Sequence, residues 1–131
     1  MIFVDSGAWY SSLIPTDPDH AAALAWLAQN TEALLTTDYI VDETLTLLRA
    51  RGQNLRANTL GTAFVDGSAA ALHFVTLDEF QGAWELFQRF SDKEWSFTDC
   101  TSKIVIEKLG LTTAFSFDHH FRQFGTVRVV P

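Results

Sequence analysis

The chain has almost no cysteine and no long apolar run, and these absences narrow the classes of protein to which it can belong. Cys100 is the only cysteine, so no intrachain disulfide can form, which fits a reducing compartment. No stretch approaches the roughly 18 uncharged apolar residues of a membrane-spanning helix, so we expect no membrane span. The first residues lack the basic and long apolar regions of a secretory signal. The cytoplasm is therefore the expected location.

Basic residues are also scarce. The 9 lysines and arginines face 16 aspartates and glutamates, which gives a formal net charge of −7. A chain this acidic is not expected to hold nucleic acid through a broad basic surface. Excess carboxylate is nevertheless what a site for a hard divalent cation needs. The charge balance is therefore compatible with a nuclease in which a metal ion binds the phosphate.

Apolar residues are abundant by contrast. They make up 47% of the 131 residues and include 11 Phe and 4 Trp, so the chain is not disordered. This length is close to the commonest size of one domain and too short for two ordinary domains. We therefore expect a single domain over residues 1–131.

Short apolar runs alternate with amphipathic stretches along the chain. Strands are predicted at residues 2–4, 33–37, 72–76, 113–117 and 127–130. Helices are predicted at residues 6–13, 18–29, 39–51, 54–65, 77–90 and 97–109. Asp17 and Asp38 are the expected N-caps of the second and third helices, and the patterns Thr76–Glu79 and Ser96–Asp99 predict capping boxes for the last two. Such alternation indicates an α/β fold, with a parallel sheet of four to five strands covered on both faces.

Four acidic residues stand at informative places in this pattern. Asp5 and Asp118 directly follow two of the expected strands, and Asp99 lies in the first turn of a helix. Glu43 lies about one turn into another helix, with apolar residues three positions before it and four after it, so we expect apolar surroundings for it. Ligands of open α/β sheets bind beyond the carboxyl ends of the strands. The four carboxylates are therefore predicted to converge at this edge.

Clustered carboxylates repel one another, which raises their pKa values unless a cation joins them. Mg²⁺ and Mn²⁺ both prefer oxygen ligands, and either can polarise a phosphoryl oxygen and activate water for attack on a phosphodiester. Each acid also has a simpler interpretation. Asp99 completes a capping box, Asp5 and Asp118 suit N-caps, and Glu43 suits a solvated helix edge. Both interpretations stay open at this point.

Four blocks of sequence resemble the PIN-domain family. They are Ile2–Ser6, Thr36–Glu43, Asp92–Cys100 and Phe115–Phe121, and each carries one of the four acids. The third block is the most specific. The blocks span nearly the whole chain in the family's order, and the length matches VapC-type toxins of bacterial and archaeal toxin–antitoxin pairs.

This resemblance implies a Mg²⁺- or Mn²⁺-dependent endoribonuclease with a three-layer α/β/α sandwich. It also implies a homodimer and inhibition by a cognate antitoxin with a DNA-binding portion. The fourth block has Ser-Phe-Asp where Thr-x-Asp is more usual, which keeps a hydroxyl. Carried over by position, Asp5 and Asp99 would be the firmest metal ligands, Glu43 and Asp118 would complete the pocket, and Ser6 and Ser116 would add hydrogen bonds around them.

Other residues suggest lesser possibilities. His119 and His120 are adjacent, and adjacent side chains on regular structure point apart, so we do not expect them to chelate a metal together. His119 remains a candidate contact for substrate because it follows Asp118. Arg49, Arg51 and Arg56 cluster in sequence and are candidates to meet an RNA backbone, an acidic antitoxin segment or only water.

Two phosphoryl-transfer classes fail on the residues themselves. A response-regulator receiver needs an acidic pair at the first strand and a lysine at the last, and a haloacid-dehalogenase-type phosphatase needs Asp-x-Asp where this chain has Asp5-Ser6-Gly7. Two alternatives remain. One is a PIN fold that binds RNA or protein without turnover, and the other is a metal-dependent nuclease acting on DNA, since the metal mechanism does not need the ribose hydroxyl.

Overall fold

Five short strands form one parallel sheet in the order β3-β2-β1-β4-β5. The computed structural model describes residues 1–131, and every neighbouring pair of strands is parallel, as the sequence predicts. The strands are β1 Ile2–Val4, β2 Leu34–Thr37, β3 Ala71–His73, β4 Thr113–Phe115 and β5 Arg128–Val130. The two halves of the chain therefore extend the sheet in opposite directions from β1, with β2 on one side and β4 on the other.

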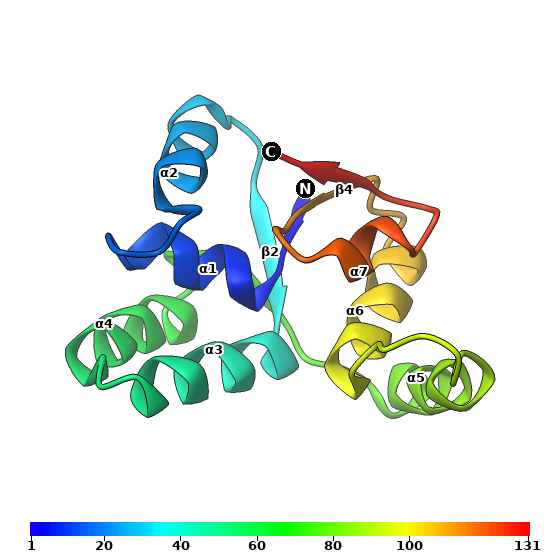
Figure 1. Cartoon of the computed structure of the whole chain (residues 1–131). Helices are drawn as coiled ribbons and strands as arrows, with labels where there is room; N and C mark the ends of the chain where they lie inside the picture. Colours follow the sequence, from blue (N-terminus) through cyan, green and yellow to red (C-terminus); the bar gives the residue numbers. More distant parts are fainter.

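Seven helices cover the two faces of this sheet. In Figure 1, α1 to α4 lie on the left of the strands and α5 to α7 on the right, which gives the expected α/β/α layers. The helices are α1 Ser6–Leu13, α2 His20–Gln29, α3 Asp38–Ala50, α4 Asn54–Val65, α5 Leu77–Arg89, α6 Phe97–Lys108 and α7 His119–Arg122. No helix combines the length and the apolar character that a membrane crossing requires.

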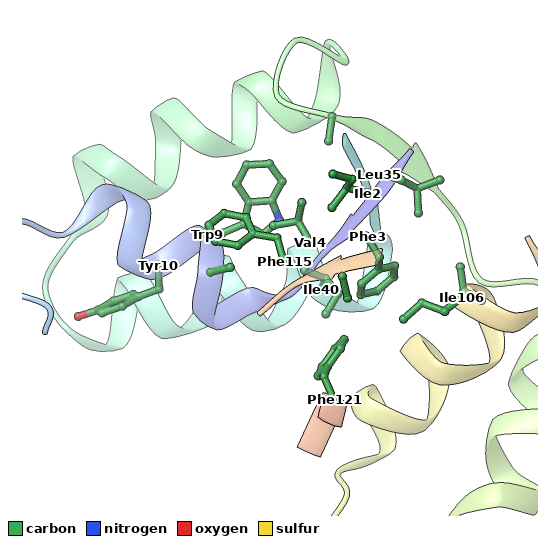
Figure 2. Packing of buried hydrophobic residues seen from close by; sticks show 14 of the residues in the cluster. Ile2, Phe3, Val4, Trp9, Tyr10, Leu35, Ile40, Ile106, Phe115 and Phe121 are labelled. Atoms are coloured by element: carbon green, nitrogen blue, oxygen red, sulfur yellow. The ribbon is translucent and has the colours of Figure 1, made fainter. Parts of the chain in front are cut away.

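The core packs on both faces of the central strand β1. All three of its residues are buried, as is usual for a parallel strand covered on both sides. Phe3 packs against α7, where its ring lies 6.0 Å from that of Phe121. On the other face Trp9 packs edge-on against Phe64 at 5.2 Å and donates its indole N–H to Thr36. Figure 2 shows Phe3, Trp9 and Phe121 around β1. The apolar N-terminal run thus anchors the residue that follows it, Asp5.

The second helix begins later than the sequence predicts. Asp17 does not cap it, and α2 starts only at His20. The Asp17 side chain instead accepts a hydrogen bond from the N–H of Asp19 at 2.9 Å, and its carbonyl accepts one from His20 at 3.1 Å. These local bonds fold residues 17–20 into a turn that competes with the helical ladder.

The cap of α3 also differs from the prediction. Thr37, rather than Asp38, is the N-cap, and its hydroxyl accepts the N–H of Ile40 at 3.1 Å. Asp38 lies inside the first turn and accepts the N–H of Val75 at 2.8 Å. This bond joins the start of α3 to the segment that follows β3.

Two strands are displaced or shorter than predicted. β3 covers residues 71–73 rather than 72–76, and β4 ends at Phe115, two residues early. Ser116 and Phe117 therefore lie between the strand and Asp118. That aspartate is the N-cap of α7, a helix of four residues that the sequence pattern does not predict. Both predicted capping boxes are confirmed, at the starts of α5 and α6.

Candidate active site

Asp5 lies buried at the carboxyl end of β1, where it begins α1. Only 4% of the residue is exposed. Its Oδ1 accepts the N–H of Ser6 at 2.8 Å, and its Oδ2 accepts the hydroxyl of Ser116 at 3.0 Å. Since Ser116 follows β4, these bonds fix the carboxylate between the ends of two neighbouring strands.

Burial raises the pKa of the Asp5 carboxyl from 3.8 to about 7. The hydrogen bonds from Ser116 and Ser6 lower this pKa in part, whereas the negative charges of Asp99 and Asp118 raise it further. Asp5 is therefore close enough to two other carboxylates to feel their charge. Without a cation, the Asp5 carboxyl is therefore only partly ionised at neutral pH.

Asp99 is the third residue of α6 and completes the capping box with Ser96. Its Oδ2 accepts the N–H of Ser96 at 3.0 Å, and its own N–H donates to the Ser96 hydroxyl at 3.0 Å. Burial, chiefly, and the charge of Asp118 raise the pKa of Asp99, while the Ser96 bond and His120 lower it. The capping interpretation is thus right for Asp99, and the same cap fixes its carboxylate next to a second acid.

Asp118 completes the group as the N-cap of α7. Its Oδ1 accepts the N–H of His120 at 2.9 Å, and its own N–H donates to the hydroxyl of Ser116 at 3.0 Å. The Ser116 hydroxyl therefore bonds to both Asp5 and Asp118 and connects these two residues. The side chain of Asp118 is 35% exposed, so this side of the group opens to solvent.

Glu43 differs from the expectation in its surroundings. The expected apolar surroundings are not found, and Glu43 lies on an exposed part of α3, as in its simpler interpretation of a solvated helix edge. It still joins the acidic residues, since its Oε1 accepts the hydroxyl of Ser6, the residue next to Asp5. All four predicted acids and both predicted serines therefore belong to one connected set of side chains.

The two histidines contradict the expectation that their side chains point apart. The rings of His119 and His120 lie 4.3 Å apart, and one nitrogen of each lies within 3.6 Å of Asp118 Oδ1. His120 Nδ1 also lies 3.1 Å from Asp99 Oδ2. One potential ligand atom from each of Asp118, His119 and His120 lies within 4.8 Å of the other two. The periodicity misses this because the helix that aims the rings has only one turn.

The acids outside this set include Asp38, Asp42 and Asp92. The carboxylate of Asp38 is engaged by Val75, and Asp42 is exposed on α3, where it lies near Thr46. Asp92 has a side chain that is 71% exposed, and its nearest charged partner is Lys93. These acids serve as controls for the four in the set.

Comparison with known proteins identifies the family. A family profile described as "PIN domain" matches residues 2–127. The chain belongs to the PIN-domain family. It is 34% identical over 131 residues to the Mycobacterium tuberculosis protein named 23S rRNA-specific endonuclease VapC20, covering 100% of this chain and 99% of that one. It is 29% identical over 123 residues to the VapC ribonuclease of Archaeoglobus fulgidus, covering 90% of this chain and 77% of that one.

Solved PIN-domain structures show the same architecture. The crystal structure of M. tuberculosis VapC20, described as a sarcin-ricin loop cleaving toxin, matches with a TM-score of 0.91 at 33% identity, over 100% of both chains. FitAcB from Neisseria gonorrhoeae, at 16% identity and a TM-score of 0.70 over 100% of this chain and 97% of that one, shares the fold. These matches confirm the predicted family, the fold class and a VapC-type endoribonuclease of a toxin–antitoxin system. PIN-domain nucleases in general use divalent metal ions.

The two capping boxes of this PIN domain allow a matched test of how Asp99 is held. Ser96→Ala removes the acceptor for the Asp99 N–H, so we expect a loss of about 1 kcal/mol in unfolding free energy and a fall in nuclease activity as the first turn of α6 frays. Thr76→Ala breaks the equivalent bond to Glu79 in α5, and we expect a similar loss of stability with unchanged activity. Urea unfolding and RNA cleavage measure the two effects. Equal activity losses in both variants would show that only general stability matters.

Proposed function

We propose that the chain hydrolyses RNA phosphodiesters with a divalent cation, Mg²⁺ or Mn²⁺, held by Asp5, Glu43, Asp99 and Asp118. The observation that carries this proposal is a group of carboxylates at one edge of the sheet that has no lysine or arginine beside it. The pKa values of Asp5 and Asp99 are both raised, and no lysine or arginine forms an ion pair with any of the four acids. A bound divalent ion would supply the missing positive charge.

The donor set suits a hard cation, because every acid offers oxygen. Three of the carboxylates have one oxygen anchored and the other without a hydrogen-bond partner in the chain. The anchored atoms are Glu43 Oε1, Asp99 Oδ2 and Asp118 Oδ1, bound by Ser6, Ser96 and His120 respectively. The second oxygens of these carboxylates, and the remaining lone pairs of the anchored oxygens, are free to bind an ion. The hydrogen bonds thus orient the ligands in advance, which lowers the cost of assembling the site.

The residues of the chain have distinct parts in the proposed chemistry. When bound, the cation supplies Lewis-acid stabilisation of the phosphoryl group and activates water. Asp5 holds the buried side of the site, and the Ser116 hydroxyl keeps its carboxylate in place. Ser6 does the same for Glu43 on the open side. The exposed side of Asp118 leaves room for a phosphodiester to approach.

We also propose that the substrate is structured ribosomal RNA. The protein is proposed to act in the cytoplasm, with its whole chain forming one nuclease domain. VapC20 is named as specific for 23S rRNA and as cleaving the sarcin-ricin loop. The full-length match and the TM-score of 0.91 support a similar substrate for this chain.

Cleavage assays with purified chain, free of antitoxin, test the proposal. Ribosomes and total RNA are incubated with Mg²⁺, with Mn²⁺ or with EDTA, using wild type, Asp99→Asn and Asp92→Asn. We expect discrete fragments that need a metal ion, disappear with Asp99→Asn and persist with Asp92→Asn. Cleavage that survives EDTA or Asp99→Asn would overturn the site. Cleavage of a DNA copy at the same rate would overturn the choice of RNA.

An antitoxin is the proposed partner for the surface along α4. Hollows of about 390 Å³ and 280 Å³ lie on its two sides, against α3 and α1. Their linings combine apolar side chains such as the exposed Leu55 with Arg49 and Arg56 at the rims. An amphipathic antitoxin segment with acidic residues fits this lining. A toxin–antitoxin complex that is unaffected by Leu55→Glu would contradict this placement.

A homodimer is the other proposed assembly, through a stripe of exposed apolar side chains on α5. Leu77, Phe80, Trp84 and Phe87 recur at helical spacing on one face, and the last two rings stack at 6.1 Å. Exposed apolar stripes of this kind mark protein interfaces, and a two-fold axis would pair the stripe with itself.

Trp84→Glu is therefore expected to convert the dimer to a monomer, because it places a charge in the middle of the α5 stripe. Light scattering after size exclusion measures the mass. Leu24→Glu, at another exposed apolar position on α2, is expected to leave the mass unchanged. A dimer that persists with Trp84→Glu would place the interface elsewhere.

A further inference from the structure

We propose that His120 provides a nitrogen ligand to the cation, through its Nδ1 atom. This inference rests on the proposed metal-dependent function and names a ligand that the four-carboxylate set does not include. It makes the site a mixed oxygen–nitrogen centre, which changes the ions that it prefers.

The position of the His120 ring carries the proposal. Its Nδ1 lies 3.1 Å from Asp99 Oδ2 and 3.4 Å from Asp118 Oδ1. The ring is largely buried, with 16% of the side chain exposed. The backbone N–H of His120 donates to Asp118, so the start of α7 fixes the backbone that carries the ring. One nitrogen therefore faces two of the proposed ligand acids from a rigid position.

The distances suit shared coordination. Neighbouring ligands of an octahedral ion with bonds of about 2.1 Å stand about 3 Å apart. The separations of Nδ1 from the two carboxylate oxygens are close to this value. A divalent cation bound by these three atoms would therefore need no large movement of the ring.

His119 is more exposed than His120 and has fewer contacts with the acids. Its side chain is 74% exposed, and its Nδ1 lies 3.6 Å from Asp118 Oδ1. It has no contact with Asp99 among the hydrogen bonds and ion pairs of the chain. The two histidines are adjacent on the same short helix, so His119 is a matched control for any general effect of losing an imidazole.

An imidazole ligand should shift the preference of the site among metal ions. Oxygen donors alone suit Mg²⁺ and Mn²⁺, whereas imidazole favours transition ions over Mg²⁺. We therefore expect Mn²⁺ to bind more tightly than Mg²⁺. His120→Gln should weaken Mn²⁺ binding by about tenfold or more, with a smaller effect on Mg²⁺.

Pulsed electron paramagnetic resonance on the Mn²⁺-loaded chain tests the ligand directly. The wild type should show modulation from a directly bound ¹⁴N, which should change with ¹⁵N-labelled histidine. His120→Gln should bind Mn²⁺ without this signal, and His119→Gln should keep it. Mn²⁺ titrations of the same three proteins, folded by circular dichroism, give the affinities.

The outcomes separate this inference from the proposed function. Mn²⁺ that binds to the wild type without nitrogen coupling, or a coupling that persists in His120→Gln, would overturn the His120 ligand and leave the carboxylate site standing. A wild type that binds no Mn²⁺ would overturn both. If His120→Gln does not fold, the labelled wild type and His119→Gln decide together, because a histidine coupling that survives in His119→Gln leaves His120 as the histidine beside Asp99 and Asp118.

Discussion

Asp5→Asn is expected to abolish RNA cleavage and, at the same time, to raise the melting temperature of the metal-free protein. The loss of activity should be on the order of 10³-fold, a size common for groups that stabilise charge at a reacting centre. The gain in stability has a different cause. The carboxyl of Asp5 has a pKa of about 7 against 3.8 when solvated, so holding it ionised above neutral pH costs folding energy. At about 1.4 kcal/mol for each pKa unit, the relief is on the order of 4 kcal/mol.

The geometry around Asp5 favours a folded variant. An amide oxygen can still accept the N–H of Ser6, and the amide nitrogen can donate to the Ser116 hydroxyl, which then accepts instead of donating. No cavity forms, because the side chain keeps its size. The substitution therefore removes charge while it retains packing.

Cleavage assays with Mg²⁺ measure the first effect and thermal unfolding in EDTA measures the second, both at about pH 8, since Asp5 is mostly ionised above its folded pKa. Asp42→Asn, at an exposed acid on α3 that lies outside the set, serves as the control and should change neither quantity. A melting temperature below that of the wild type would mean that the lost activity reflects a damaged fold. Wild-type cleavage would remove Asp5 from the reaction.

The parts of this protein that the sequence predicts correctly are those decided by neighbouring residues. The run Ile2-Phe3-Val4 is apolar on both faces, so it predicts a buried central strand and places Asp5 at its end. The capping box of Ser96 and Asp99 involves residues three positions apart. Its pattern is complete in the sequence, and the structure follows it.

The errors arise where a distant contact decides between local alternatives. Thr37 and Asp38 are both good N-caps, and the choice falls to Thr37 because Asp38 bonds to Val75, 37 residues away. Glu43 and Ser6, which also form a hydrogen bond, are likewise 37 residues apart in the sequence. No periodicity reports such pairs, since they depend on how the sheet brings α1 and α3 together.

The histidine pair shows a second kind of limit. The expectation that His119 and His120 diverge assumes a regular element long enough to set alternating directions. They instead begin α7, a helix of only four residues, whose N-cap Asp118 draws the His120 N–H toward the acids. A helix of one turn leaves no amphipathic pattern to detect.

The stability of the metal-free protein is expected to fall as the pH rises from about 4 to about 7, and a divalent cation is expected to reverse this fall. The pKa of Asp5 is about 7 in the folded state and 3.8 in the unfolded state. Between these values the folded chain binds more protons than the unfolded chain, so the free energy of unfolding decreases with rising pH. Asp99 acts in the same direction, because its pKa is also raised.

Glu79, whose pKa is shifted in the opposite direction, does not mask the fall in stability between about pH 4 and about pH 7. The pKa of Glu79 is lowered, by the N–H of Thr76 and by His73 against the opposing effect of burial. A lowered carboxyl pKa contributes stability that is present above its unfolded value of 4.5 and is lost as the pH falls below it. The stability contributed by Glu79 therefore changes only at acid pH, where Asp5 is protonated in the folded chain.

A cation binds the ionised carboxylates in competition with protons, so its stabilising effect should grow with pH. Thermal unfolding at about pH 5 and about pH 8, with EDTA or with saturating Mg²⁺, should show a larger increase in melting temperature with Mg²⁺ at the higher value. Asp5→Asn should flatten the pH dependence in EDTA and reduce the response to Mg²⁺. An equal response to Mg²⁺ at both pH values would mean that the ion binds elsewhere, because only groups that titrate across this range link metal binding to the proton.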